Sequence, residues 1–324
     1  MNIHVVNDTS TATSIRLANP RGFCAGVDRA IDIVNSALDI FGAPIYVRHE
    51  VVHNKFVVDI LRKRGAIFVD ELSNIPIKDE HGRSSIVIFS AHGVSIAVKD
   101  EARAKGYKIF DATCPLVTKV HLEVTKFSQE GRECVLIGHQ FHPEVEGTMG
   151  QINDKNKIKL VQNQSDVESL EVNQTEKICY VTQTTLSIDE TKEIIKKLKE
   201  KYPHITGPNK SDICYATQNR QDAIKTLLKN NELVIVVGSS NSSNSNRLAD
   251  LASQAGVESI LVGNIDKFDL SILENKKRVA ITAGASAPEI LVKDLIKKIK
   301  MNYDVLIDEM NGIEENVIFK LPTI

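Results

Sequence analysis

The stretch Ile109-Phe-Asp-Ala-Thr-Cys114-Pro-Leu-Val-Thr-Lys-Val120 decides the fold, because it sets a cysteine between a short apolar strand and a helix. Two further stretches, Cys24-Ala-Gly-Val-Asp-Arg-Ala and Cys214-Tyr-Ala-Thr-Gln-Asn-Arg, also carry a cysteine just before a predicted helix. These three cysteines are 90 and 100 residues apart. We therefore expect a structural repeat of roughly 100 residues.

Polar residues recur at fixed distances behind each of these cysteines, after an apolar strand. The first set follows at 29, 28 and 28 residues and comprises His53, His142 and Ser242. The second follows at 68, 70 and 72 residues and comprises His92, Thr184 and Ser286. Letter-by-letter identity between the repeats is negligible, so the argument rests on spacing. The spacing predicts three units, each with one cysteine and two polar loops.

Strand and helix signals alternate along the whole chain. Residues 86–89, 233–237 and 279–282 have the β-branched composition of buried strands, and apolar residues in 24–41 follow a helical period. This alternation predicts an α/β fold with mostly parallel sheets. Together with the cysteine repeat, it predicts three similar units arranged pseudo-threefold around a central metal-cluster cavity. The predicted units span residues 14–112, 113–212 and 213–300, and residues 301–324 form a C-terminal tail.

Composition excludes several classes of protein. The 324 residues include 40 basic and 42 acidic side chains, and this balance argues against a nucleic-acid partner. No apolar run approaches the roughly 18 residues of a membrane span, and the first residues lack the layout of a secretory signal. We therefore expect a cytoplasmic protein without a nucleic-acid or membrane partner.

The five cysteines do not describe a disulfide framework, since their number is odd and no Cys-x-x-Cys occurs. Cys134 and Cys179 fall inside predicted strands, where packing in the core is the expected role. Ligands of parallel α/β sheets gather at the carboxyl ends of the strands, so the other three thiols should meet at one point. Three thiolates lack the fourth ligand of a structural zinc site and better match an iron–sulfur cluster with one open iron. Three isolated, reduced cysteines are the alternative.

The loops around this point are poor in Lys and Arg and rich in His, Ser, Thr and Asn. Helix N-termini with free N–H groups can nonetheless bind an anion there. One acid, Glu144, follows a strand-end loop and is two residues from His142, a position that suits a proton donor. Glu146 is the other candidate for this role, since it is equally close in sequence. A first-turn acid that complements the helix dipole is the alternative interpretation of Glu144.

Eight motifs together resemble the LytB/IspH family of 4-hydroxy-3-methylbut-2-enyl diphosphate reductases, in order from about residue 15 to 300. They are Pro20-Arg-Gly-Phe-Cys-Ala-Gly-Val, Ser90-Ala-His-Gly-Val-Ser, Asp111-Ala-Thr-Cys-Pro-Leu-Val, His142-Pro-Glu-Val-Glu-Gly-Thr, Thr182-Gln-Thr-Thr-Leu-Ser, Asp212-Ile-Cys-Tyr-Ala-Thr-Gln-Asn-Arg, Gly238-Ser-Ser-Asn-Ser-Ser-Asn-Ser and Thr282-Ala-Gly-Ala-Ser-Ala-Pro-Glu.

The resemblance implies an oxidoreductase that catalyses the last step of the non-mevalonate isoprenoid pathway. It would remove an allylic hydroxyl with two electrons and two protons, giving isopentenyl and dimethylallyl diphosphate, with ferredoxin or flavodoxin as electron donor. The family's three α/β domains around a central cluster agree with the repeat.

Carried over by motif, the resemblance implies a role for each candidate site residue. Cys24, Cys114 and Cys214 would hold one 4Fe–4S cluster per chain with an open apical iron. The residues that would bind the diphosphate are His53, His92, Ser242, Ser243, Asn244 and Ser286, with His142 in the same network. Thr184 would contact the substrate hydroxyl, and Glu144 would supply the proton.

Two other functions stay open. One is a three-cysteine iron–sulfur dehydratase of the quinolinate synthase type, which would need no reductant. The other is a non-catalytic metal-binding or redox-sensing protein, which would not bind an allylic diphosphate.

Overall fold

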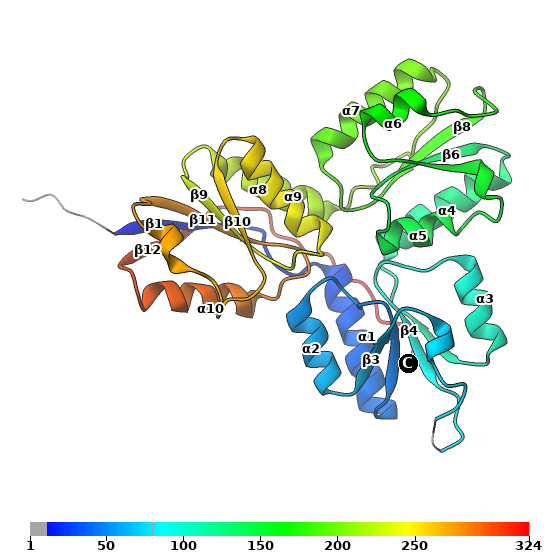
Figure 1. The fold of residues 1–324 in the computed structure, drawn as a ribbon, viewed down its shortest axis with the longest axis horizontal. Coiled ribbons are helices and arrows are strands. Elements are labelled where there is room, and N and C mark those ends of the chain that lie inside the picture. Colours follow the sequence, from blue (N-terminus) through cyan, green and yellow to red (C-terminus); the bar gives the residue numbers. More distant parts are fainter. Residues whose placement is uncertain (1–11, 80, 324) are drawn as a thin grey trace, which may run out of the picture.

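The computed structural model describes residues 12–79 and 81–323 and shows three lobes around a common centre (Figure 1). Each lobe contains one parallel sheet, and the three sheets have four, three and five strands. The predicted α/β fold is therefore confirmed. The structure also contains three short 3₁₀ turns, at Leu72–Asn74, Lys155–Lys157 and Leu270–Leu273.

The first lobe follows Cys24. Its strands, in sheet order, are β3 (Ala66–Val69), β2 (Ile45–Arg48), β4 (Ile86–Phe89) and β5 (Lys108–Asp111). Its helices are α1 (Ala25–Phe41), α2 (Lys55–Lys63) and α3 (Ile96–Ala104). Helix α1 buries an apolar stripe that packs with residues of β2 in one hydrophobic cluster.

The second lobe follows Cys114. Its strands, in sheet order, are β7 (Ile158–Val161), β6 (Glu133–Ile137) and β8 (Ile178–Thr182). Its helices are α4 (Pro115–Gln129), α5 (Pro143–Met149), α6 (Gln164–Ser169) and α7 (Ile188–Lys201). Cys134 and Cys179 are opposite each other in β6 and β8 and are fully buried, as expected for core residues.

The third lobe follows Cys214, and its sheet includes the first and the last strand of the described chain. Its strands, in sheet order, are β10 (Glu258–Val262), β9 (Leu233–Val237), β11 (Arg278–Ala283), β1 (Thr13–Leu17) and β12 (Val305–Glu309). Its helices are α8 (Tyr215–Leu228), α9 (Ser243–Gln254) and α10 (Glu289–Lys300).

The three sheets share one strand order, and the N-terminal strand completes the last of them. In each lobe the strand preceding the next cysteine lies beside the third strand: β5 beside β4, a bridge at Thr206 beside Cys179 of β8, and β1 beside β11. Strand β1 precedes Cys24 along the chain but pairs in the third sheet. Strand β1 thereby connects the third lobe to the first cysteine, so that the three lobes form a closed circle.

Strand membership differs from the sequence prediction at both termini. Strand β1 falls in the range assigned to the first unit, 14–112, and β12 falls in the predicted tail, 301–324, yet both belong to the third sheet. The physical reason is that pairing between parallel strands depends on partners distant in sequence, which a local pattern does not reveal. The boundaries near 112 and 212 stay a prediction.

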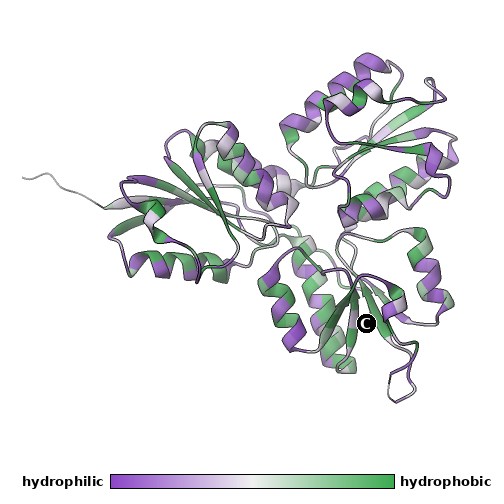
Figure 2. Ribbon diagram, in the orientation of Figure 1, coloured by the Kyte–Doolittle hydropathy of each residue, from purple (hydrophilic) through white to green (hydrophobic). Residues whose placement is uncertain are grey.

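The strands form the apolar interior of every lobe, and the helices turn their hydrophilic residues outward (Figure 2). All five residues of β6, of β8 and of β9 are buried. Strands covered on both faces by helices are buried along their whole length in this way. Within residues 12–79 and 81–323, no helix has the length and apolar character needed to cross a bilayer.

Candidate functional site

The three predicted cysteines lie at the N-termini of three equivalent helices. Cys24, Cys114 and Cys214 are the N-cap residues of α1, α4 and α8. Their N–H groups donate hydrogen bonds to carbonyls just past the third strand of a lobe, those of Ala285 (3.3 Å), Ala91 (3.0 Å) and Thr184 (3.0 Å). One backbone arrangement therefore repeats three times. It aims three helix N-termini, with their positive dipole ends, at one point.

All three thiols line one cavity of about 110 Å³ at the junction of the lobes. Gly26 creates room there, because a Cβ at this position would lie 2.7 Å from Sγ of Cys114 and 3.9 Å from Sγ of Cys24. The lining of the cavity also includes Leu116, Tyr215 and Phe319.

Burial makes these thiols weak acids in the metal-free protein. Desolvation raises the pKa of Cys114 to about 12, with the neighbouring Cys24 and Cys214 thiols adding to the rise. Desolvation also raises the pKa of Cys214 to about 11 and that of Cys24 above its ordinary value. A bound metal group would be needed to keep them as thiolates.

The donor set fits an iron–sulfur cluster better than one metal ion. In the described part of the chain, no group of three or more His, Cys, Asp or Glu side chains is arranged to hold a metal ion. Three thiols around an open cavity, at helix N-termini, instead match a larger iron–sulfur group.

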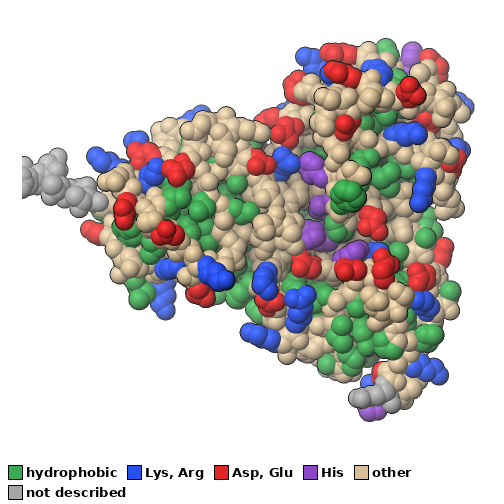
Figure 3. Space-filling model, in the orientation of Figure 1, with side chains coloured by type: hydrophobic (Ala, Val, Ile, Leu, Met, Phe, Trp, Pro, Cys, Tyr) green, Lys and Arg blue, Asp and Glu red, His purple; other side chains and the backbone are tan. Residues whose placement is uncertain are grey.

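Three predicted histidines converge at the polar end of the same cavity. The rings of His53 and His92 stack with centroids 4.1 Å apart, and His142 meets them edge-on at 5.4 and 5.6 Å. Histidine side chains accordingly gather where the lobes meet (Figure 3). Desolvation lowers the pKa of His142 to about 3, and it lowers the pKa of His92 well below the ordinary value, with the neighbouring histidines adding to both effects.

The serine and asparagine loop faces these rings with unused hydrogen-bonding capacity. Ser286 donates to the backbone carbonyl of His53 at 2.9 Å and lies 3.4 Å from Ser242, the N-cap of α9. Asn244 is 3% exposed, and both polar atoms of its amide lack a partner, as does Nε2 of His53. Buried groups of this kind are costly unless a ligand satisfies them. An anion with several oxygens would do so.

Glu144 lies inside the cavity, whereas Glu146 does not. The Glu144 side chain accepts two hydrogen bonds from Thr184, from the backbone N–H to Oε1 at 2.6 Å and from Oγ1 to Oε2 at 2.9 Å. Desolvation raises the pKa of Glu144 to about 7, although the Thr184 bonds oppose this. The Glu146 side chain is 61% exposed and pairs with Arg48 at 3.6 Å. Of these two acids, Glu144 is therefore the one that can hold a proton beside the thiols.

The repeat predicted from spacing is one residue out of register at two places. Because the carbonyls of Ala91, Thr184 and Ala285 are equivalent, Thr185 rather than Thr184 matches His92 and Ser286. Likewise, Asn54 rather than His53 is the N-cap of α2, equivalent to His142 and Ser242. Sequence reasoning missed Asn54, although an Asn directly before a helical pattern is a recognisable capping signal.

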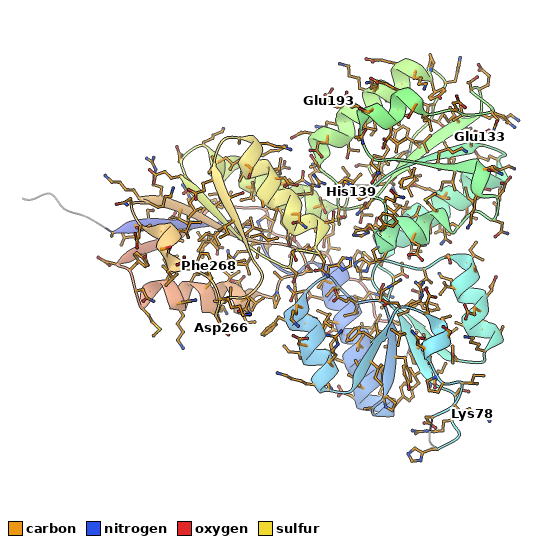
Figure 4. The ribbon with its side chains drawn as sticks, in the orientation of Figure 1. Lys78, Glu133, His139, Glu193, Asp266 and Phe268 are labelled. Atoms are coloured by element: carbon orange, nitrogen blue, oxygen red, sulfur yellow. The ribbon has the colours of Figure 1, made fainter. Side chains whose placement is uncertain are left out.

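The remaining histidines play other parts or lie elsewhere. His139, labelled at the junction of the second and third lobes in Figure 4, contacts Arg247 of α9 at 2.9 Å. His121 is buried beneath Gly93, and His204 is on the surface beside Glu176. His4 lies outside the described residues.

Comparisons with known proteins agree on one family. A family model described as LytB protein matches residues 15–300. The 4-hydroxy-3-methylbut-2-enyl diphosphate reductase of Saccharophagus degradans is 62% identical over 95% of this chain and 98% of its own length. The reductase of the same name from Pseudomonas aeruginosa is 58% identical over 95% of this chain and 97% of its own length.

The fold has solved relatives as well. The structure of the E-1-hydroxy-2-methyl-but-2-enyl-4-diphosphate reductase from Plasmodium falciparum superimposes with a TM-score of 0.90 at 39% identity, covering 96% of each chain. A solved (E)-4-hydroxy-3-methyl-but-2-enyl diphosphate reductase, described as the terminal enzyme of the non-mevalonate pathway, gives a TM-score of 0.62 at 29% identity and covers 89% of this chain.

Proposed function

The chain belongs to the LytB protein family, and from this premise we propose that it is a 4-hydroxy-3-methylbut-2-enyl diphosphate reductase. The reaction removes the allylic hydroxyl with two electrons and two protons and yields isopentenyl and dimethylallyl diphosphate. The observation that carries the proposal is a single cavity that combines three thiols, a protonatable carboxyl and a cluster of anion-binding groups.

Cys24, Cys114 and Cys214 are the residues that would hold one 4Fe–4S cluster with an open apical iron. When bound, the cluster would supply electrons and a Lewis-acidic site for the substrate oxygen. The chain's own contribution is geometric. Three helix N-termini favour the negative charge of a thiolate-bound cluster, and Gly26 leaves space beside the Cys114 sulfur.

The diphosphate would occupy the polar end of the cavity. His53, His92 and His142 offer ring nitrogens there, and the N-terminus of α9 offers Ser242, Ser243 and Asn244, with Ser286 alongside. The unpartnered atoms of Asn244 and His53 support this assignment. An anion would favour the protonated histidines, so binding should be accompanied by proton uptake.

Glu144 would deliver a proton to the departing hydroxyl. A pKa of about 7 allows a carboxyl to be protonated at neutral pH and still give up its proton. Thr184 donates to this carboxyl through both its N–H and its hydroxyl, so it holds the acid in place. Its hydroxyl would also contact the substrate hydroxyl. A hydroxyl is a poor leaving group unless it is protonated, which makes this step necessary.

The two electrons must come from outside the chain. We propose ferredoxin or flavodoxin as the donor, because both are one-electron carriers suited to a cluster. A cytoplasmic location would fit the five cysteines, all of which are free.

An anaerobic turnover assay with a reduced dye and the allylic diphosphate tests the function. We expect reductant consumption matched by formation of both five-carbon diphosphates. Loss of water from the substrate without reductant, giving a dehydration product in place of isopentenyl and dimethylallyl diphosphate, would indicate the dehydratase alternative. Absence of saturable diphosphate binding would indicate the redox-sensing alternative. The comparisons favour neither of the two.

A further inference from the structure

Each cysteine-bearing helix carries a cation one turn or more after its cysteine. Arg29 follows Cys24 by five residues, Lys119 follows Cys114 by five, and Arg220 follows Cys214 by six. None of these side chains lines the cavity, and the proposed reaction does not use them. We call Arg29, Lys119 and Arg220 the cation ring, because each one reaches the loop that carries the next cysteine.

Arg29 links the first helix to the second cysteine loop. Its Nη1 donates to the backbone carbonyl of Thr113 at 3.0 Å, directly before Cys114. A weaker bond at 3.5 Å reaches the carbonyl of Asp111. The side chain thus connects α1 to the backbone that sets the position of the second thiol.

Lys119 makes the equivalent link from the second helix to the third cysteine loop. Its Nζ donates to Oδ1 of Asp212 at 2.7 Å and to the carbonyl of Lys210 at 3.0 Å, both just before Cys214. Asp212 is fully buried and also accepts the N–H of Thr182 at 2.9 Å, at the end of β8. The loop before Cys214 is therefore hydrogen-bonded both to α4, through Lys119, and to the end of β8, through Thr182.

Arg220 closes the ring by linking the third helix to the first cysteine loop. Its guanidinium donates to the carbonyl of Gly22 at 2.7 and 3.0 Å and to that of Phe23 at 3.1 Å, directly before Cys24. The side chain is completely buried. Burying a charge is costly unless it is paired and hydrogen-bonded, so this contact is retained against a substantial desolvation penalty.

The C-terminal segment braces two members of the ring. Glu315 pairs with Arg220 at 3.1 Å and accepts from Asn219, and the carbonyl of Lys320 accepts from Nε of Arg29 at 2.9 Å. The segment thereby crosses from the third lobe to the first, where the chain ends (Figure 1). Between these two anchors, Phe319 lines the cavity.

We propose that the cation ring positions the three cluster-binding thiols. Each cation ties one cysteine loop to the cysteine-bearing helix of a neighbouring lobe, and these three links fix the spacing of the thiols. The inference rests on the proposed iron–sulfur function. It explains why three helices with negligible sequence identity each carry a cation five or six residues after the cysteine. The three lobes otherwise have separate sheets and separate cores, so spacing between thiols depends on contacts of this kind.

The test compares Arg29→Met and Lys119→Met with two matched controls. Methionine keeps an unbranched stem and removes the cation. The controls are Arg103→Met on α3, whose partner Asp100 is a surface neighbour, and Lys126→Met, farther along the same α4 helix as Lys119. Arg29→Lys and Lys119→Arg keep a cation at each ring position. Each protein is reconstituted anaerobically, and iron release to a ferrous chelator is timed.

We expect iron release to be about tenfold faster or more in the two ring variants, since a hydrogen bond to a charged group is lost in each. Lysine or arginine at the ring position should restore slow release. The metal-free melting temperature of Arg29→Met should match those of the controls, whereas Lys119→Met should melt lower, because the buried Asp212 carboxylate loses its cationic partner. Release at the control rate would overturn the proposal. So would a loss of melting temperature in Arg29→Met that accounts for its faster release.

A second readout needs no cluster and separates this inference from the proposed function. In metal-free protein, iodoacetamide should modify Cys114 faster in Arg29→Met and Cys214 faster in Lys119→Met, with buried Cys134 as the internal reference. Unchanged alkylation would count against the ring. Wild-type protein that takes up no iron would instead refute the cluster, whatever the alkylation rates.

Discussion

Replacing Glu144 with Gln should remove a pH-dependent loss of stability from the metal-free protein. The carboxyl is 3% exposed, and burial raises its pKa from the ordinary 4.5 to about 7. When folding raises the pKa of a carboxyl, that group makes its full contribution to the free energy of unfolding only at a pH below its pKa in the unfolded state. That contribution is lost as the pH rises through about 7.

The size of this effect follows from the two pKa values. At about 1.36 kcal/mol per pKa unit, wild type should lose roughly 2–3 kcal/mol between pH 5 and pH 9 because of this one group. Glutamine has the same shape but does not titrate, so the variant should lack this loss. Other titrating groups, such as His142 and Cys114, are common to both proteins and cancel in the difference.

The assay is urea unfolding of both metal-free proteins, under reductant, at intervals from pH 5 to pH 9. The difference in free energy of unfolding should favour Glu144→Gln increasingly as the pH rises to about 7 and should then level off. Glu146→Gln is the control, because that side chain is exposed, and its difference from wild type should be flat. A flat difference for Glu144→Gln would refute the argument that this carboxyl is protonated near neutral pH. In the loaded enzyme, the same variant should reduce turnover by about 10²–10⁴-fold while retaining its iron.

Two further substitutions test the two ends of the cavity. His53→Ala or His92→Ala should raise the KM for the diphosphate about tenfold to a hundredfold without loss of iron, because each removes a charge-assisted hydrogen bond; an unchanged KM in both would place the anion elsewhere. Gly26→Ala should impair iron uptake while the metal-free protein melts normally, because the new methyl carbon would lie 2.7 Å from the Cys114 sulfur and force that sulfur to move. Full iron content in this variant would show that the Cys114 sulfur does not need this position.

Spacing along the chain predicted the site better than it predicted the sheets. The three cysteines, and His53, His92 and His142, converge as expected, because the carboxyl ends of parallel strands meet at one edge. The one-residue error at Thr184 arose because loop lengths differ between units, so that equal spacing does not guarantee equivalent backbone positions.

Contacts between units were beyond the reach of the sequence. Strand β1 precedes the first cysteine yet pairs with β11 and β12, which no local pattern indicates. Arg29 and Arg220 appear in the quoted cysteine motifs, but their carbonyl acceptors lie 84 and 198 residues away along the chain. Such pairings depend on how the lobes meet in three dimensions.

Iron and sulfide content per chain in anaerobically prepared Cys→Ser variants tests the central claim most directly. Wild type should hold one cluster, and Cys24→Ser, Cys114→Ser and Cys214→Ser should each lose it, since a serine oxygen is a poor replacement for a soft thiolate. Cys134→Ser is the control, because that thiol is fully buried in β6. Full iron in Cys114→Ser, or loss of iron from folded Cys134→Ser, would contradict the claim that these three thiols form the cluster site.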